Sequence, residues 1–353
     1  MSKASSGNYF EDFDLGLVLS HSTPRTITSG DVALYISLTG SRHLLHCSAP
    51  DAKRAGFADQ LVDDLLAFHI AFGKTVNDIS LNAAANLGYA DVRFLEPVYI
   101  GDTIKSQSEV IGLKENSSGK TGVVYVRSNA WNQDGKLVLT WIRWVMVNKK
   151  NVQSAAPVAH VPELPAFVAP ENLPVFAEMR LDNFDTAASG STHRWSDYKA
   201  GEFIWHVDGI TIDESDHTQA TRLYQNNARV HFNQHQMQDS RFGKRLVYGG
   251  HIISLARSLS FNGLANAVRI AAINSGSHTN PSFAGDTIYA ATKVLNQWAL
   301  PGRNDIGALR LRTLALKNPD QDKVTFPESD QGRKIEYDSN MVLDLDYTVL
   351  MPI

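Results

Sequence analysis

Two polar loops in this sequence each carry a histidine that could do acid–base chemistry. His46 lies in the first loop and His231 in the second. Imidazole changes its charge near neutral pH, so either side chain could take a proton from water and return it. Ser41 and Asn226 precede these histidines at the same spacing; an asparagine amide can orient a water molecule but cannot accept a proton at neutral pH. The alternative for each is a structural loop histidine with both ring nitrogens hydrogen-bonded.

Motifs for other chemistries are missing from the sequence. There is no HExxH, no Cys/His cluster, no GxGxxG, no Walker loop and no GxSxG. His231 and His235 could share one helical face, but they lack neighbouring acids. We therefore expect neither a metal nor a nucleotide cofactor.

Composition narrows the class of protein. The chain has 353 residues and a net charge of −4, which gives no sign of a nucleic-acid-binding surface. No run approaches the ~18–20 apolar residues of a membrane helix, and the polar N-terminus has no secretory signal. Cys47 is the single cysteine, which excludes an intrachain disulfide and fits a reducing compartment. We expect a soluble cytoplasmic protein.

The sequence is internally duplicated, which identifies the elements that must position the two histidines. At an offset of 185 residues, His21 aligns with His206, His46 with His231, and Phe57 with Phe242. A constant register of this kind predicts two copies of one domain. A segment rich in proline and alanine separates them, so we expect domains at 1–150 and 184–353 with a linker at 151–183.

Each half shows the same order of elements. A short helix precedes the histidine loop, and a long apolar helix follows it, expected at 61–77 and 249–262. Runs of β-branched and aromatic residues then predict strands, clearest at 123–131, 137–147, 308–316 and 341–350. One long helix wrapped by an antiparallel sheet is an α+β arrangement, and two such sheets can join edge to edge.

These features resemble the MaoC-like (R)-specific enoyl-CoA hydratases. The resemblance rests on the histidine loop, a following Phe-Gly, a helix that opens with small residues, and P-x-x-x-G-D-T. The longer phrases TRLYQNNARVHFN, RFGKRLVYGGHIISLARSLSFNGLAN and VDDLLAFHIAFGKTV are most similar to the mesaconyl-CoA (2-methylfumaryl-CoA) hydratases. The resemblance implies a tandem, or double, hotdog fold. The family's motif G-D-x-N-P-x-H has an acid where this chain has Ser41 and Asn226.

The resemblance also implies catalytic roles. His231 would transfer the proton, Asn226 would hold the water, and Gly249 and Gly250 would offer N–H donors to the thioester oxygen. The glycines could instead serve close helix packing. With no acid in the motif, the rate is expected to follow an imidazole titrating near ~6–7. The alternative is a carboxylate from elsewhere, with Asp63 and Asp64 as candidates.

Substrate-binding residues follow from the same resemblance, in which the histidine loop of one unit faces the helix of the other. The expected set is Asp63, Asp64, Leu65, Leu66, Asn86, Leu87, Gly88, Tyr89, Pro97, Val98 and Tyr99, with Arg229 for a substrate carboxylate. Several have ordinary alternatives: helix-start acids, turn and strand residues, or a solvent-facing arginine. His46 and Ser41 would form a second site, which we expect to be decayed.

The implied function is reversible hydration of mesaconyl-CoA to β-methylmalyl-CoA by a hydro-lyase. A hotdog thioesterase and a non-catalytic acyl-CoA-binding protein are the alternatives. The expected partner is an acyl-CoA, with CoA as part of the substrate rather than a cofactor. No nucleic acid or membrane partner is expected, and homo-oligomerisation is left open.

Overall fold

The computed structural model describes residues 3–328 and 335–353. The N-terminal half contains η1 (Phe10–Asp12), β1 (Val18–Thr26), α1 (Ser29–Thr39), α2 (Leu44–Cys47), α3 (Ala49–Arg54), α4 (Asp64–Thr75), the π-helical turn η2 (Val76–Ser80), β2 (Ala83–Phe94), β3 (Thr103–Glu115), β4 (Thr121–Trp131) and β5 (Leu137–Asn148). Three short helices follow: η3 (Pro170–Asn172), α5 (Thr186–Ser189) and η4 (Trp195–Asp197). The C-terminal half contains β6 (Phe203–Thr211), α6 (Glu214–Leu223), α7 (Arg229–Phe232), α8 (Gln234–Met237), α9 (Gly249–Leu259), α10 (Phe261–Leu264), β7 (Arg269–His278), β8 (Thr287–Ala299), β9 (Ile306–Lys317), η5 (Gln321–Lys323) and β10 (Met341–Pro352).

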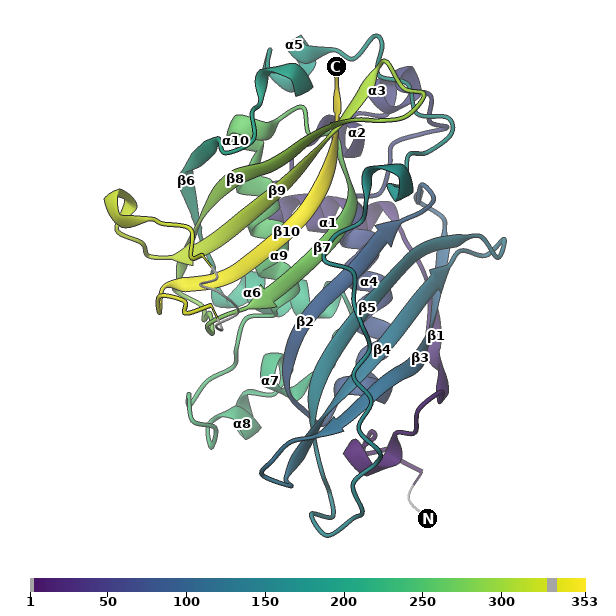
Figure 1. The fold of residues 1–353 in the computed structure, drawn as a ribbon, viewed down its shortest axis with the longest axis vertical. Helices are drawn as coiled ribbons and strands as arrows, with labels where there is room; N and C mark the ends of the chain where they lie inside the picture. Colours follow the sequence, from purple (N-terminus) through teal and green to yellow (C-terminus); the bar gives the residue numbers. More distant parts are fainter. Residues whose placement is uncertain (1–2, 329–334) are drawn as a thin grey trace.

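The strands of both halves form one antiparallel sheet. Its order is β1-β3-β4-β5-β2-β7-β10-β9-β8-β6, so the halves meet where β2 pairs with β7 (Figure 1). Tyr89 lies opposite Gly276 and Val92 opposite Ile273 at this junction. The predicted α+β class and the edge-to-edge joining of two sheets are confirmed, and the join removes two exposed strand edges.

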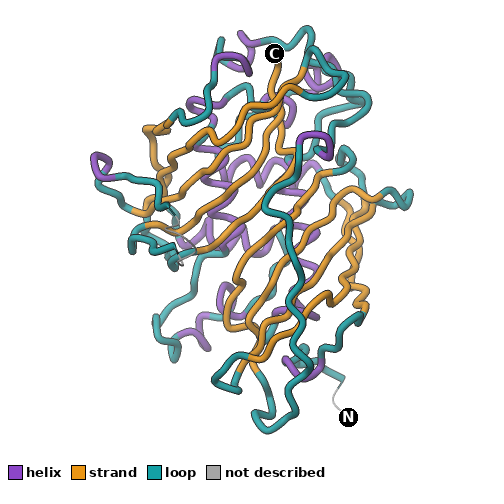
Figure 2. The backbone as a smooth tube through the Cα atoms, in the orientation of Figure 1, coloured by secondary structure: helices purple, strands orange, loops and turns teal. Residues whose placement is uncertain are grey.

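The two long helices lie behind the sheet, in the layer that Figure 2 shows beneath the strands. Every residue of α4 is buried, and α9 is buried from its second residue onward. The Nε2 atom of His69 in α4 lies 3.0 Å from the hydroxyl of Ser254 in α9, and the two residues are 185 apart in sequence. Equivalent positions therefore meet at a pseudo-two-fold axis. No helix in the described part of the chain is long and apolar enough to cross a membrane.

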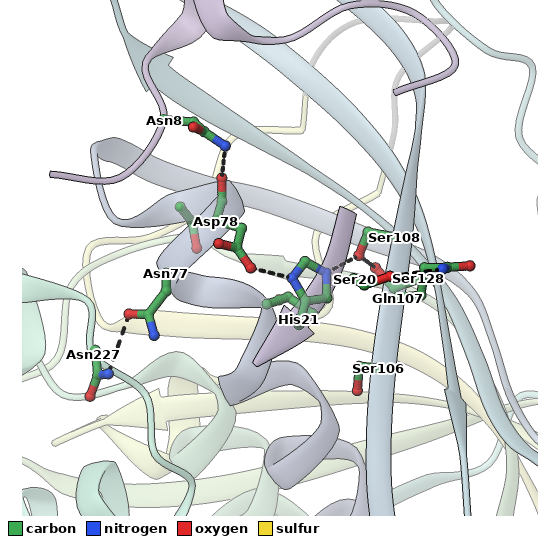
Figure 3. Close-up of polar contacts among 12 residues, drawn as sticks. Asn8, Ser20, His21, Asn77, Asp78, Ser106, Gln107, Ser108, Ser128 and Asn227 are labelled. Carbon is green, nitrogen blue, oxygen red and sulfur yellow. Dashed lines mark hydrogen bonds and ion pairs between the residues drawn. The ribbon is translucent and has the colours of Figure 1, made fainter. Parts of the chain in front are cut away.

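The aligned histidines His21 and His206 have structural roles. His21 lies between Asp78 of η2, 2.7 Å from Nδ1, and Ser108 of β3, 2.8 Å from Nε2 (Figure 3). This carboxylate–imidazole–hydroxyl order resembles a hydrolytic triad, but Ser108 is fully buried. His206 makes the equivalent contacts with the Asn262 carbonyl and the hydroxyl of Thr292. In each half, this histidine connects the first strand by a hydrogen bond to the segment that follows the long helix.

The segment between the halves is packed against the sheet. Its path crosses the face opposite the helices (Figure 1), and His160 forms a β-bridge with Leu113. Val168, Leu173 and Phe176 are buried in a core cluster with residues of both halves. This segment is therefore part of the folded unit. The domain boundaries at 1–150, 151–183 and 184–353 stay a prediction.

Buried histidines make the stability of this fold sensitive to acid. Burial lowers the pKa of His69 to about 3 and the pKa values of His206 and His251 to about 4. Below the unfolded pKa of ~6.5, the unfolded chain binds protons that the folded chain does not. We expect the free energy of unfolding to fall as pH drops from about 6.5 towards 4, by up to ~1.4 kcal/mol per pH unit for each histidine.

Urea unfolding at a series of pH values tests this expectation in His206→Gln. The variant should show a shallower loss of stability with acid than the wild type, whatever its stability at neutral pH. The matched control is His235→Gln, because His235 is exposed in α8. An unchanged slope in His206→Gln would contradict the assignment.

Candidate active site

One cavity of about 280 Å³ lies at the junction of the two halves. The N-terminal half contributes the end of α4, η2, the start of β2 and one residue of β5; the C-terminal half contributes the histidine loop, the start of α9 and the end of β7. The residues central to its chemistry are Phe72, Ser80, Asn86, Tyr89, Arg143, Asn226, His231, Tyr248, Gly249 and His278. The lining contains no aspartate or glutamate among the described residues.

His231 is arranged as a neutral base. It lies in α7, and its Nδ1 is 3.0 Å from the carbonyl oxygen of Leu246, to which it must donate. The lone pair is therefore on Nε2. The ring lies edge-on to Tyr248 at 5.5 Å, the residue is half-buried at the cavity wall, and this burial lowers the pKa of the imidazole to about 4. The imidazole is neutral at physiological pH and able to accept a proton.

Asn226 presents a hydrogen-bond donor to the cavity. Its side chain is buried, and its Oδ1 accepts the backbone N–H of Ala228 at 3.0 Å. This bond leaves the amide N–H₂ for a cavity ligand. Gln225, with a φ of 52°, turns the chain just before it. The loop is also held to the other half, because Asn227 donates to Asn77 at 3.3 Å (Figure 3).

The start of α9 places backbone N–H groups at the cavity wall. Tyr248 is the N-cap residue and makes no side-chain cap hydrogen bond, so the first-turn N–H groups have no side-chain acceptor there. A Cβ on Gly249 would lie 2.4 Å from the ring of His278, and one on Gly250 would lie 2.4 Å from that of Tyr248. Close packing therefore requires glycine at both positions, and only Gly249 lines the cavity.

The sequence did not indicate several polar residues that line this cavity, among them Arg143, Tyr248 and His278. Arg143 is fully buried in β5 and has no carboxylate partner among the described residues. The Nε2 of His278 lies 3.1 Å from the hydroxyl of Tyr89. An arginine within the apolar strand run LVLTWIRWVMV was the signal that could have identified Arg143.

The structure brings only part of the expected substrate-binding set to this cavity. Asn86 and Tyr89 line it. The residues that do not line it are Asp63, Asp64, Leu65, Leu66, Leu87, Gly88, Pro97, Val98, Tyr99 and Arg229. These residues lie away from this cavity, contrary to the expectation from the sequence. The reason is the pseudo-two-fold axis: the start of α9 lies beside the end of α4, so the start of α4 is at the opposite side of the helix pair.

Arg229, the arginine expected to hold a substrate carboxylate, does not line the reaction cavity. Arg229 donates from Nη1 to the side-chain oxygen of Asn82 at 2.9 Å. Arg222 is exposed and lines a separate polar cavity with Lys74 and Gln225. Neither guanidinium faces the reaction cavity.

The equivalent region of the N-terminal half is filled by protein. His46 lies 3.8 Å from Asp64, and Ser41 donates to Asp63 at 3.1 Å. Asp64 also accepts from Arg269, whose guanidinium lies 3.4 Å from the ring centre of Phe176. The cavity that remains beside Asp64 is about 10 Å³, room for at most one water molecule. This arrangement is consistent with a decayed second site, which stays a prediction.

Comparison with known proteins places this geometry in a family. The mesaconyl-CoA hydratase family profile matches residues 2–327. The β-methylmalyl-CoA dehydratase of Chloroflexus aurantiacus is 59% identical over 350 residues, covering 99% of this chain and 98% of the relative. The crystal structure of a MaoC domain protein from Chloroflexus aurantiacus superposes with a TM-score of 0.96, with 58% identity and coverage of 100% and 99%.

A more distant structure confirms the architecture. A conserved hypothetical protein from Mycobacterium tuberculosis, which has a double hotdog fold, superposes with a TM-score of 0.76. Its identity is 25%, and the alignment covers 99% of each chain. The expected double hotdog is thereby confirmed. With one cavity built by both halves around His231 and Gly249, this chain belongs to the mesaconyl-CoA hydratase family.

Proposed function

We propose that this protein is a hydro-lyase that reversibly adds water to mesaconyl-CoA and forms β-methylmalyl-CoA. The observation that carries the proposal is the neutral imidazole of His231, with a free Nε2, in the same cavity as the helix start at Gly249. The family and the name of the Chloroflexus relative support this substrate.

The proposed reaction uses one histidine for both proton transfers. The amide of Asn226 holds a water molecule, and Nε2 of His231 takes a proton from it as the oxygen attacks the β carbon. The electron pair moves to the thioester oxygen, where first-turn N–H groups of α9 stabilise the enolate. The imidazolium then returns the proton to the α carbon. The proton removed from water is the proton delivered to the α carbon, so this reaction uses neither a carboxylate nor a cofactor.

The residues around the cavity suggest where CoA binds and argue against a thioesterase. Arg241 lies at the edge of the cavity with its guanidinium 4.4 Å from the ring centre of Phe242, and we propose that the phosphates of CoA bind beside it. A thioesterase needs a carboxylate nucleophile or base, and the described lining has none.

Reaction with CoA thioesters and the single thiol of Cys47 support a cytoplasmic location.

Replacement of each loop histidine in turn tests which half is active. His231→Ala should lower kcat/KM for hydration of mesaconyl-CoA by at least ~10²-fold, because the proton acceptor is removed. His46→Ala is the matched control at the equivalent loop position and should cost much less. Stopped-flow or mass-based assays of both variants, with circular dichroism to confirm folding, make the comparison. If the two variants lost activity equally, or His46→Ala lost more, the assignment of the active site to His231 would be wrong.

The pH dependence expected from the structure differs from the titration near 6–7 expected from the sequence. Since burial lowers the pKa of His231 to about 4, kcat/KM of the wild type should stay flat from about pH 8 down to about pH 5 and fall below that. Asn226→Asp adds a carboxylate that favours imidazolium, so it should raise the apparent pKa and move the acid limb towards neutral pH.

Asn226→Ala separates water positioning from titration. It should depress kcat/KM without moving the acid limb, because no charge is added near His231. The measurement is the pH profile of kcat/KM for the three proteins. An acid limb that stays in place in Asn226→Asp would show that His231 is not the group being titrated.

A further inference from the structure

Arg143 is a buried cation at the wall of the reaction cavity whose hydrogen-bonding capacity is largely unused. Its side chain is 1% exposed. Nη2 donates to the hydroxyl of Thr75 at 2.8 Å, and both terminal nitrogens lie 3.4 Å from the hydroxyl of Ser80. Nε has no partner, and the guanidinium lies 4.2 Å from the ring centre of Phe72. Of five N–H donors, only those facing two hydroxyl groups are occupied.

A buried charge without a counterion is costly, and this fold provides a contrast. Arg269 is equally buried, but its Nη2 lies 3.2 Å from the carboxylate of Asp64. No carboxylate lies within 4.0 Å of Arg143 among the described residues. Burial lowers its pKa to about 10, so it remains charged at neutral pH. Desolvation of this kind is normally offset by an anion.

The hotdog framework does not require an arginine at this position. In β4–β5 Arg143 pairs with Val126, and in β9–β10 Tyr347 pairs with Leu311. Val126 and Leu311 are equivalent under the 185-residue repeat, so Arg143 and Tyr347 are equivalent too. Tyr347 is buried and hydrogen-bonds Thr313 at 3.1 Å. The same sheet position in the C-terminal half is thus filled by an uncharged side chain.

We propose that Arg143, with Ser80 and Thr75, is a subsite for the free carboxylate of a dicarboxylic acyl-CoA. This inference rests on the proposed hydration and deepens it. In an unsaturated acyl-CoA with a four-carbon dicarboxylic backbone, the β carbon that receives water also bears the free carboxylate, wherever the methyl branch lies. A guanidinium that binds this carboxylate therefore places the β carbon beside the water held at His231 and Asn226.

The position of Arg143 within the cavity suits this role. Its guanidinium lies over Phe72, whose ring is 6.0 Å from that of Tyr248, and Tyr248 in turn contacts His231. The cation and the base are thus separated by two aromatic rings that line one cavity. A planar guanidinium with free donors can bind a carboxylate through two parallel hydrogen bonds. This subsite selects a dicarboxylic substrate over one that ends in a methyl group.

The experiment compares mesaconyl-CoA with 2-methylcrotonyl-CoA, in which a methyl group replaces the carboxylate. Arg143→Met should lower kcat/KM for mesaconyl-CoA by at least ~10²-fold and leave that for 2-methylcrotonyl-CoA unchanged or higher. Arg143→Lys keeps the charge without the bidentate geometry, so its kcat/KM for mesaconyl-CoA should lie between those of the wild type and Arg143→Met. The matched control is Arg127→Met on the adjacent strand, because Arg127 pairs with Asp91 outside the cavity.

Inhibition by saturated thioesters separates this inference from the proposed reaction. Succinyl-CoA should bind the wild type more tightly than butyryl-CoA, and Arg143→Met should abolish that preference; a direct calorimetric titration gives the same comparison without turnover. Hydration of neither enoyl-CoA by the wild type would refute the proposed function alone. Retention of the wild-type preference by folded Arg143→Met, or by Arg143→Lys and Arg143→Gln if the methionine variant does not fold, would overturn the carboxylate subsite.

Discussion

The packing of α4 against α9 is the contact on which the rest of this structure depends. The hydroxyl of Ser254 lies 3.0 Å from both His69 and the hydroxyl of Tyr35, inside a core where water cannot substitute for these partners. Because equivalent residues meet at this point, the two halves are related by a pseudo-two-fold axis and their sheets join at β2 and β7. The start of each helix is then carried to the end of the other, which is where the cavity lies.

Duplication produces two equivalent regions, and packing distinguishes them. At the start of α9, Gly249 lines the cavity, and the N-cap residue Tyr248 makes no side-chain hydrogen bond to the first turn. At the start of α4, Asp63 caps the helix by accepting the N–H of Leu65, and Asp64 accepts from Arg269. Phe176, from the segment between the halves, covers this ion pair. The cavity left beside Asp64 in the N-terminal half is about 10 Å³.

Burial also determines the chemistry of the open cavity. An imidazole in water would titrate near ~6.5, but burial at the cavity wall lowers the pKa of His231 to about 4. Burial also imposes a desolvation cost on the guanidinium of Arg143, which has no counterion among the described residues, and binding of an anion would offset that cost. A neutral base and an unpaired cation in one cavity are suited to an anionic acyl group that reacts with water.

The sequence by itself determined the duplication, the α+β class, the two long helices and the residues of the histidine loop. These follow from local signals: periodic apolar residues, β-branched runs, and a register of 185 residues that pairs His46 with His231. It could not determine which end of α4 meets the histidine loop. It also could not reveal that Arg143 of one half lies in the same cavity as Asn226 of the other. Only the tertiary structure decided these points, because they depend on antiparallel helix packing across the pseudo-two-fold axis and on burial, which bring together side chains with no local relation in the chain.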